Sequence, residues 1–124
     1  MDEFPKNAKP FSLEGLTFDA KCIKVYDGDT ITVIFKYNEV FYKWRIRLLR
    51  INAPELRKET KLEGIIVRDK VRELLLGKIV KVECGKFDAF GRILGEVYIG
   101  DTNVSSKLLS LGLVRHFGDK KVSF

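Results

Sequence analysis

Five short segments in which apolar side chains recur with strand spacing constrain the fold of this chain most. Three of them, residues 16–25, 30–37 and 40–51, come first, and residues 79–83 and 91–99 follow an intervening segment with helical spacing. Five strands with a helix between the third and the fourth are typical of a Greek-key barrel of the OB type. The sequence therefore predicts a mainly β fold with helices (α+β), built on one five-stranded OB-type barrel.

The third strand segment alternates between apolar and basic side chains. Its even positions carry the apolar set, Tyr42, Trp44, Ile46 and Leu48. Its odd positions carry Lys43, Arg45 and Arg47. Because successive strand residues point to opposite faces, we expect one face in the core and one basic face outside. A short turn at Asn38-Glu39 is expected to join this strand to the one before it.

The segment between the third and fourth strands predicts a helix. Thr60 and Glu63 have the spacing of a capping box, and Gly77 is placed to end the helix in a left-handed cap. The apolar residues at helical spacing, expected to form the buried stripe, are Leu62, Ile65, Ile66, Leu74 and Leu75. A shorter C-terminal helix is expected over residues 103–111, closing at Gly112.

Length and charge set the class of protein. With 124 residues the chain is expected to form one domain over residues 16–118, with a loosely ordered arm at 1–15 and a basic tail at 119–124. The net charge of +6 favours a polyanionic partner, although a merely soluble basic surface explains it equally well.

The cysteines and the hydropathy of the sequence indicate where in the cell the protein is expected. Cys22 and Cys84 lack the neighbours of a metal site and lie in alternating apolar segments, which predicts buried free thiols. No signal peptide and no apolar run of membrane-spanning length is visible, so an intracellular protein without a membrane partner is the default expectation.

Four short motifs carry groups suited to phosphate chemistry. Asp27-Gly28-Asp29 sets two carboxylates around a glycine, which can grip a hard cation or form an ordinary turn. Glu55 follows Pro54 and is expected near the mouth of the barrel. Arg47 and Arg92 can hold a phosphate through paired N–H groups. Each of these residues taken alone is also compatible with a solvated surface position.

Taken together and in order, the motifs resemble the staphylococcal nuclease (thermonuclease-like) family. The resemblance rests on the strings DGDTITV, RIRLLRINAPE, FDAFGRILGEV and NVSSKLLSLGLV, and it covers about residues 20–118. It implies Ca²⁺-dependent hydrolysis of DNA or RNA with little sequence preference. The implied substrate is single-stranded or locally open, and we expect a monomer.

The resemblance also implies a role for each matching residue. Asp29 and the backbone carbonyl of Ala53 would bind the metal, and Asp27 would act on it through water. Arg47 would clamp the scissile phosphate, while Arg92 would stabilise the charged transition state and the leaving group. Glu55 would orient or deprotonate the attacking water.

The sequence departs from the family pattern at Asn52, at Phe90 and near its C-terminal end. Asn52 stands where the family usually has a second metal-binding aspartate, so it offers one neutral carbonyl oxygen in place of a carboxylate. Phe90 replaces a tyrosine and keeps a ring that can stack on a base. The family's tyrosines near the nucleotide do not align, and Lys120 is the candidate for a replacement phosphate contact, or else part of a solvated tail.

The Asn52 substitution leaves an alternative open. A calcium-dependent nuclease is the first hypothesis, with weakened metal binding. A catalytically weak or inactive nucleic-acid-binding OB module is the second, because OB barrels bind single strands with basic grooves and aromatic side chains. A protein-interaction domain is the third, and the +6 charge argues mildly against it.

Overall fold

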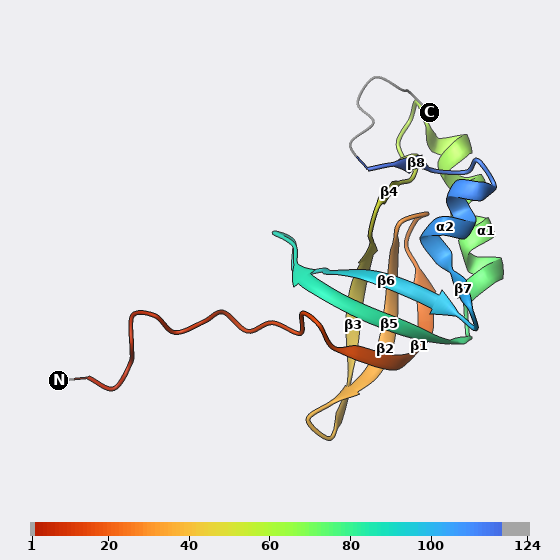
Figure 1. Cartoon of the computed structure of the whole chain (residues 1–124). Coiled ribbons are helices and arrows are strands. Elements are labelled where there is room, and N and C mark those ends of the chain that lie inside the picture. Colours follow the sequence, from red (N-terminus) through yellow and green to blue (C-terminus); the bar gives the residue numbers. More distant parts are fainter. Residues whose placement is uncertain (1, 118–124) are drawn as a thin grey trace.

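Five strands wrap into a closed barrel in the computed structural model, which describes residues 2–117 (Figure 1). The strands are β1 (Thr17–Val25), β2 (Thr30–Tyr37), β3 (Val40–Leu48), β5 (Ile79–Phe87) and β6 (Ile93–Ile99). Neighbours pair in the order β3-β2-β1-β5-β6, and a parallel pairing of β3 with β6 closes the barrel. The predicted OB-type α+β fold is confirmed.

Two helices and three short strands complete the part of the fold that the structure describes. These are β4 (Ile51–Asn52), α1 (Lys61–Leu75), β7 (Thr102–Asn103), α2 (Val104–Ser110) and β8 (Arg115–His116). Both helices lie on the same side of the barrel (Figure 1). None of the helices between residues 2 and 117 combines the length and the apolar character needed to cross a membrane.

Three strand boundaries differ from the prediction. The third segment does not run unbroken to residue 51, because Arg50 adopts a left-handed φ of 70° and separates β3 from β4. Strand β5 extends to Phe87, and β6 begins only at Ile93, because residues 88–92 form a turn held by Asp88. The turn at Asn38-Glu39 is confirmed, with both residues at positive φ.

The barrel interior confirms the alternation predicted for the third strand. Ile46 and Leu48 are fully buried, and Trp44 is half-buried with its ring stacked 4.7 Å from that of Phe35. Tyr42 lies next to the hairpin turn and is exposed. The opposite face, with Lys43, Arg45 and Arg47, points out of the core.

Helix α1 corrects two predictions. The capping box does not form, because the Thr60 hydroxyl donates instead to the carbonyl of Glu55 at 2.8 Å. Leu62 and Ile66 are exposed, and the buried face is Gly64, Val67, Val71 and Leu75. At Gly64 a Cβ would stand 2.9 Å from the carbonyl oxygen of Glu55, so glycine allows this face of the helix to approach the segment before it. Gly77 has the predicted left-handed conformation, with φ of 79°.

The chain before β1 runs out from the barrel (Figure 1). Its last part is anchored, because Leu13 is buried and the Gly15 N–H donates to the carbonyl of Cys84 at 2.9 Å. Both cysteines are buried free thiols as predicted, and burial raises the pKa of each. The domain boundaries at residues 15 and 118 stay predictions, and the tail at 119–124 lies outside the described residues.

Candidate active site

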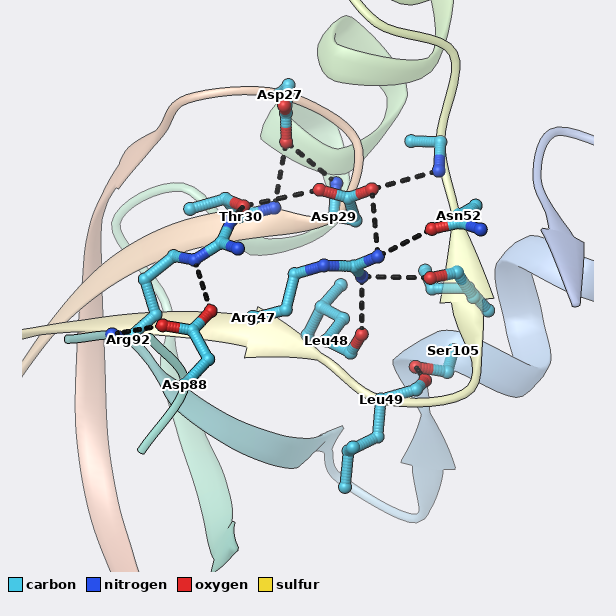
Figure 2. A network of polar contacts seen from close by, with 12 residues as sticks. Asp27, Asp29, Thr30, Arg47, Leu48, Leu49, Asn52, Asp88, Arg92 and Ser105 are labelled. Atoms are coloured by element: carbon cyan, nitrogen blue, oxygen red, sulfur yellow. Dashed lines mark hydrogen bonds and ion pairs between the residues drawn. The ribbon is translucent and has the colours of Figure 1, made fainter. Parts of the chain in front are cut away.

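The side chain of Asp27 holds the loop between β1 and β2 in a tight turn. Its Oδ1 accepts N–H bonds from Asp29 at 3.0 Å and from Thr30 at 2.9 Å (Figure 2). A Cβ on Gly28 would stand 2.5 Å from Val67 Cγ1 and 2.6 Å from Ala53 Cβ. Only glycine therefore lets this loop pack against α1 and residue 53. The Asp-Gly-Asp string forms a turn, and this turn places the carboxylates of Asp27 and Asp29 close together.

Asp29 is nearly buried and fastens this loop to the segment after β4. One of its carboxylate oxygens accepts the Thr30 hydroxyl at 3.2 Å, and the other accepts the Ala53 N–H at 2.9 Å. The same oxygen lies 3.6 Å from Nη2 of Arg47. The carboxylate is held in position by groups from three segments of the chain.

Arg47 lies on β3 opposite Thr30, and its guanidinium donates hydrogen bonds to several oxygen atoms around it (Figure 2). Its Nη1 donates to the carbonyls of Leu48 at 2.7 Å and Ile51 at 2.8 Å, and its Nη2 donates to Asn52 Oδ1 at 2.7 Å. The left-handed residue Arg50 turns the chain between these two carbonyls. These bonds use three of the five N–H donors of the guanidinium, and its Nη2 also faces the Asp29 carboxylate.

Arg92 is positioned by Asp88, a residue that the sequence prediction missed. Asp88 Oδ2 accepts from Arg92 Nε at 2.7 Å, while its Oδ1 accepts the backbone N–H groups of Phe90 and Arg92 at 2.9 Å each. Burial raises the pKa of Asp88, but these hydrogen bonds and the charge of Arg92 outweigh burial and leave the pKa below its ordinary value. An Asp four residues before an Arg, with a glycine between them, was the available signal.

Thr30 joins the two parts of the site and was also missed. Its hydroxyl accepts from Arg92 Nη1 at 3.1 Å and donates to Asp29 Oδ1 (Figure 2). One hydroxyl thus links a guanidinium from the β5–β6 turn to a carboxylate from the β1–β2 loop. The sequence string DGDT contained Thr30, but nothing in it identified the partner 62 residues away.

Glu55 is held more loosely than the other site residues. Its carboxylate lies 3.2 Å from Nε of Arg57, and both side chains are more than 60 % exposed. An ion pair this exposed contributes about 0–1 kcal/mol, so it does not lock Glu55 in one position. Arg57 is a further cation at the site that the sequence prediction missed.

One cleft of about 620 Å³ collects nearly all the predicted residues. Those lining it are Asp27, Asp29, Arg47, Asn52, Ala53, Glu55 and Arg92. Phe90 lines an adjoining hollow and is 73 % exposed, with its ring 5.5 Å from the Arg92 guanidinium carbon. Lys120 lies outside the described residues.

The carboxylate and carboxamide oxygens in the cleft are the type of ligand that a hard cation prefers, but together they carry little negative charge. Burial and the neighbouring negative charge of Asp29 raise the pKa of Asp27 to about 6, so a cation between the two carboxylates would relieve this repulsion. Asn52 adds a neutral oxygen, which already accepts from Arg47. Within residues 2–117 no cluster of three or more Asp, Glu, His or Cys side chains surrounds a common point. The set fits a weakly held Ca²⁺.

Comparison with known proteins identifies relatives of this chain. Residues 45–123 match the family model described as staphylococcal nuclease homologue. A protein of Escherichia coli named as an uncharacterized endonuclease is 38% identical over 93 residues, which are 74% of this chain and 56% of that protein. A probable staphylococcal-like nuclease of Oryza sativa subsp. japonica is 34% identical over 84 residues, or 66% of this chain and 22% of that protein. The chain therefore spans about half the length of the bacterial relative and less of the plant one.

Proposed function

Since this chain belongs to the staphylococcal nuclease family, we propose that it hydrolyses the phosphodiester backbone of DNA or RNA, with Ca²⁺ as cofactor and little sequence preference. The observation that carries the proposal is the convergence in one cleft of two arginines, two aspartates and a glutamate from separate segments of the barrel. A strand with an accessible backbone, single or locally open, is the substrate that an open cleft of this kind admits.

The two arginines are proposed to bind the reacting phosphate. Attack on phosphorus adds negative charge to its oxygens, so donors already aimed at that position favour the transition state over the bound substrate. Arg47 is held by backbone carbonyls and Arg92 by Asp88, so neither has to be ordered when the substrate arrives. Positioned donors of this kind avoid a reorganisation cost during the reaction.

Glu55 is proposed to orient or deprotonate the attacking water. It lines the same cleft as the arginines, and its exposed ion pair with Arg57 leaves it free to approach the phosphate. Asp29, Asn52 and the Ala53 carbonyl would hold Ca²⁺, with Asp27 acting through water. When bound there, the ion would supply positive charge to the phosphate oxygens and help to place the water.

The alternative function is a nucleic-acid-binding module with weak or no cleavage. The observation that favours it is Asn52, whose only carboxamide oxygen accepts a hydrogen bond from Arg47. Ca²⁺ would have to share that oxygen with a cation, and the site lacks the charge of a further carboxylate. The nucleic-acid substrate is the same in both hypotheses, and only turnover separates them.

Cleavage of an end-labelled single-stranded oligonucleotide tests the proposal. Ca²⁺ is added in steps to the full chain, with EDTA as the blank, and wild type is compared with Glu55→Gln. Glu63→Gln is the matched control, because Glu63 is an exposed acid in the first turn of α1 that does not line the cleft.

We expect cleavage that requires metal, falls by about 10²–10³ in Glu55→Gln and is unchanged in Glu63→Gln. Binding of the oligonucleotide without cleavage at any calcium concentration would establish the alternative function instead.

A further inference from the structure

The outer face of β1, β2 and β3 carries rows of basic side chains that lead away from the cleft. Thr30 and Arg47 form the row at the active site. The next row on the same face sets Lys24, Thr32 and Arg45 side by side across three strands. The row beyond it is Lys21, Ile34 and Lys43.

A β-bulge in β1 places both of its lysines on this face. Lys21 and Lys24 are three residues apart, so an unbroken strand would point them to opposite faces. The register between β1 and β2 shifts between Cys22 and Lys24, and both lysines are exposed while Cys22 and Val25 are buried. The bulge therefore adds a cation to the outer face at the cost of a regular ladder.

The positive charge on this face is not paired with carboxylates within the described residues 2–117. Lys36 continues it toward the hairpin, where its ammonium lies 5.1 Å from the centre of the Phe41 ring. We call the five side chains Lys21, Lys24, Lys36, Lys43 and Arg45 the basic track. Among residues 2–117 none of the five forms an ion pair. Like charges on neighbouring strands repel, and a polyanion laid over them would relieve this repulsion.

A hollow of about 500 Å³ connects the basic track to the active-site cleft. Lys24, Thr32 and Arg45 line it, and it shares Tyr26, Asp27 and Arg92 with the cleft. Tyr26 and Phe90 at its edge are 59 % and 73 % exposed. Proteins that bind single strands stack unpaired bases on aromatic rings and hold the phosphates with basic side chains nearby. The Arg45 guanidinium also donates to the carbonyl of Phe90, which ties the ring's loop to the track.

We propose that the basic track is a binding site for the single-stranded nucleic acid that flanks the scissile phosphate. The track holds successive phosphates, while Tyr26 and Phe90 stack on the base at the hollow. Four residues of strand separate Arg47 from Lys43, a span of about 13 Å. A span of this length holds only a few nucleotides of an unstacked strand, at or below the lower end of the range for OB barrels. This inference rests on the proposed function for the identity of the strand and extends it to the strand's path.

Binding of a fluorescein-labelled 15-nucleotide oligo-dT tests the track in EDTA, where cleavage cannot interfere. Fluorescence anisotropy is measured over a series of salt concentrations for the full chain. The track variant is Lys21→Ala with Lys43→Ala, two exposed residues that do not line the cleft. The control variant, Lys78→Ala with Lys107→Ala, removes the same charge from an exposed lysine that points to α1 and from an exposed lysine on α2. Thermal unfolding of each variant verifies its fold.

We expect the track variant to reduce the slope of log affinity against log salt by about 1.4, because each lost phosphate contact removes about 0.7 for a single strand. The control variant should keep the wild-type slope. An equal change of the salt slope in both variants, or tighter binding of duplex than of single strand, would contradict the proposal that the basic track binds single strands.

Cleavage in Ca²⁺ then separates this inference from the proposed function. If wild type cleaves nothing while the track variant alone loses salt-dependent binding, the nuclease proposal fails and the track stands. If wild type cleaves and both variants bind the 15-mer equally well, the track fails and the nuclease proposal stands.

Discussion

The arginine side and the carboxylate side of the cleft are built differently. Arg47 and Arg92 are each held by charged or carbonyl oxygens at 2.7–2.8 Å that come from the protein itself. On the carboxylate side, Asp27 and Asp29 lie next to each other and repel, while the neutral Asn52 is engaged by Arg47. The arginine side is complete before any ligand arrives, whereas the carboxylate side still needs positive charge.

From this difference we predict which property each side controls. A prearranged pair of guanidiniums should set the rate of the chemical step, because it acts on charge that develops in the transition state. A carboxylate pair that needs a cation should set how much metal is required, because relief of repulsion drives the binding. The following variants test that division.

The largest effect is expected for Arg47→Ala. Loss of the proposed phosphate donor should lower kcat by about 10²–10³ at saturating metal, or about 3–4 kcal/mol. Arg47→Lys should recover little of this, because an ammonium cannot reach the carbonyls of Leu48 and Ile51 and a phosphate together. Arg68→Ala, an arginine paired with Asp69 on α1, is the control in the oligonucleotide assay. Full recovery by lysine would show that charge alone is needed and would contradict the fork geometry.

A smaller effect, on metal affinity in place of rate, is expected for Asn52→Asp. A second direct carboxylate ligand should tighten Ca²⁺ binding about tenfold, because one added charge at contact distance is worth about 1–4 kcal/mol in a hydrated site. Calorimetric titration with Ca²⁺ measures it. Asn38→Asp is the control, since Asn38 lies in the β2–β3 turn at a φ of 51° that aspartate tolerates. An unchanged metal affinity in Asn52→Asp would show that residue 52 does not bind the ion.

Thr30→Val tests the connection between the two sides. The change keeps the shape of the residue but removes the hydroxyl that joins Arg92 to Asp29. The lost bond to Arg92 is worth about 1 kcal/mol to the position of that guanidinium, so we expect kcat to fall about fivefold with little change in KM. Thr17→Val, at the exposed start of β1, is the control in the same assay. If the loss appears in KM alone, Thr30 contributes to binding and does not position Arg92.

The smallest effect is expected in the pH dependence of stability for Asp88→Asn. The pKa of Asp88 is lowered in the folded protein, so its charge stabilises the fold above the unfolded-state pKa of about 4. That stability is lost as the pH falls through the folded-state pKa. The thermal midpoint of wild type should therefore exceed that of Asp88→Asn at pH 6–7, and the gap should close below about pH 4. A gap that stays constant down to pH 3 would mean that the charge of Asp88 is not its source.

Local patterns of the sequence were sufficient for most of the barrel. The strand β2, the turn at Asn38-Glu39 and the two faces of β3 follow from period-2 alternation and turn chemistry, which act between near neighbours. The motif order predicted the family and the residues that gather in the cleft. Both depend on short strings, and such strings are visible without a structure.

Tertiary contacts decided what those strings could not. Helix α1 turns Val67 and Val71 inward and leaves Leu62 and Ile66 in solvent, and Gly64 on the buried face packs against the carbonyl of Glu55. Thr60 bonds that same carbonyl and does not cap the helix. Propensity and periodicity describe one segment at a time, so they cannot anticipate a partner from another segment.

The site shows the same division. The resemblance of the sequence to the nuclease family predicted that Asp29, Arg47, Glu55 and Arg92 form one site, and the four residues line one cleft. Only the folded barrel showed that Asp88 holds Arg92, that Thr30 joins it to Asp29, and that Arg47 engages Asn52. The bond between Thr30 and Arg92 forms because closure of the barrel brings residues distant in the sequence together. The bond between Arg47 and Asn52 forms because the left-handed turn at Arg50 brings Asn52 back to the guanidinium.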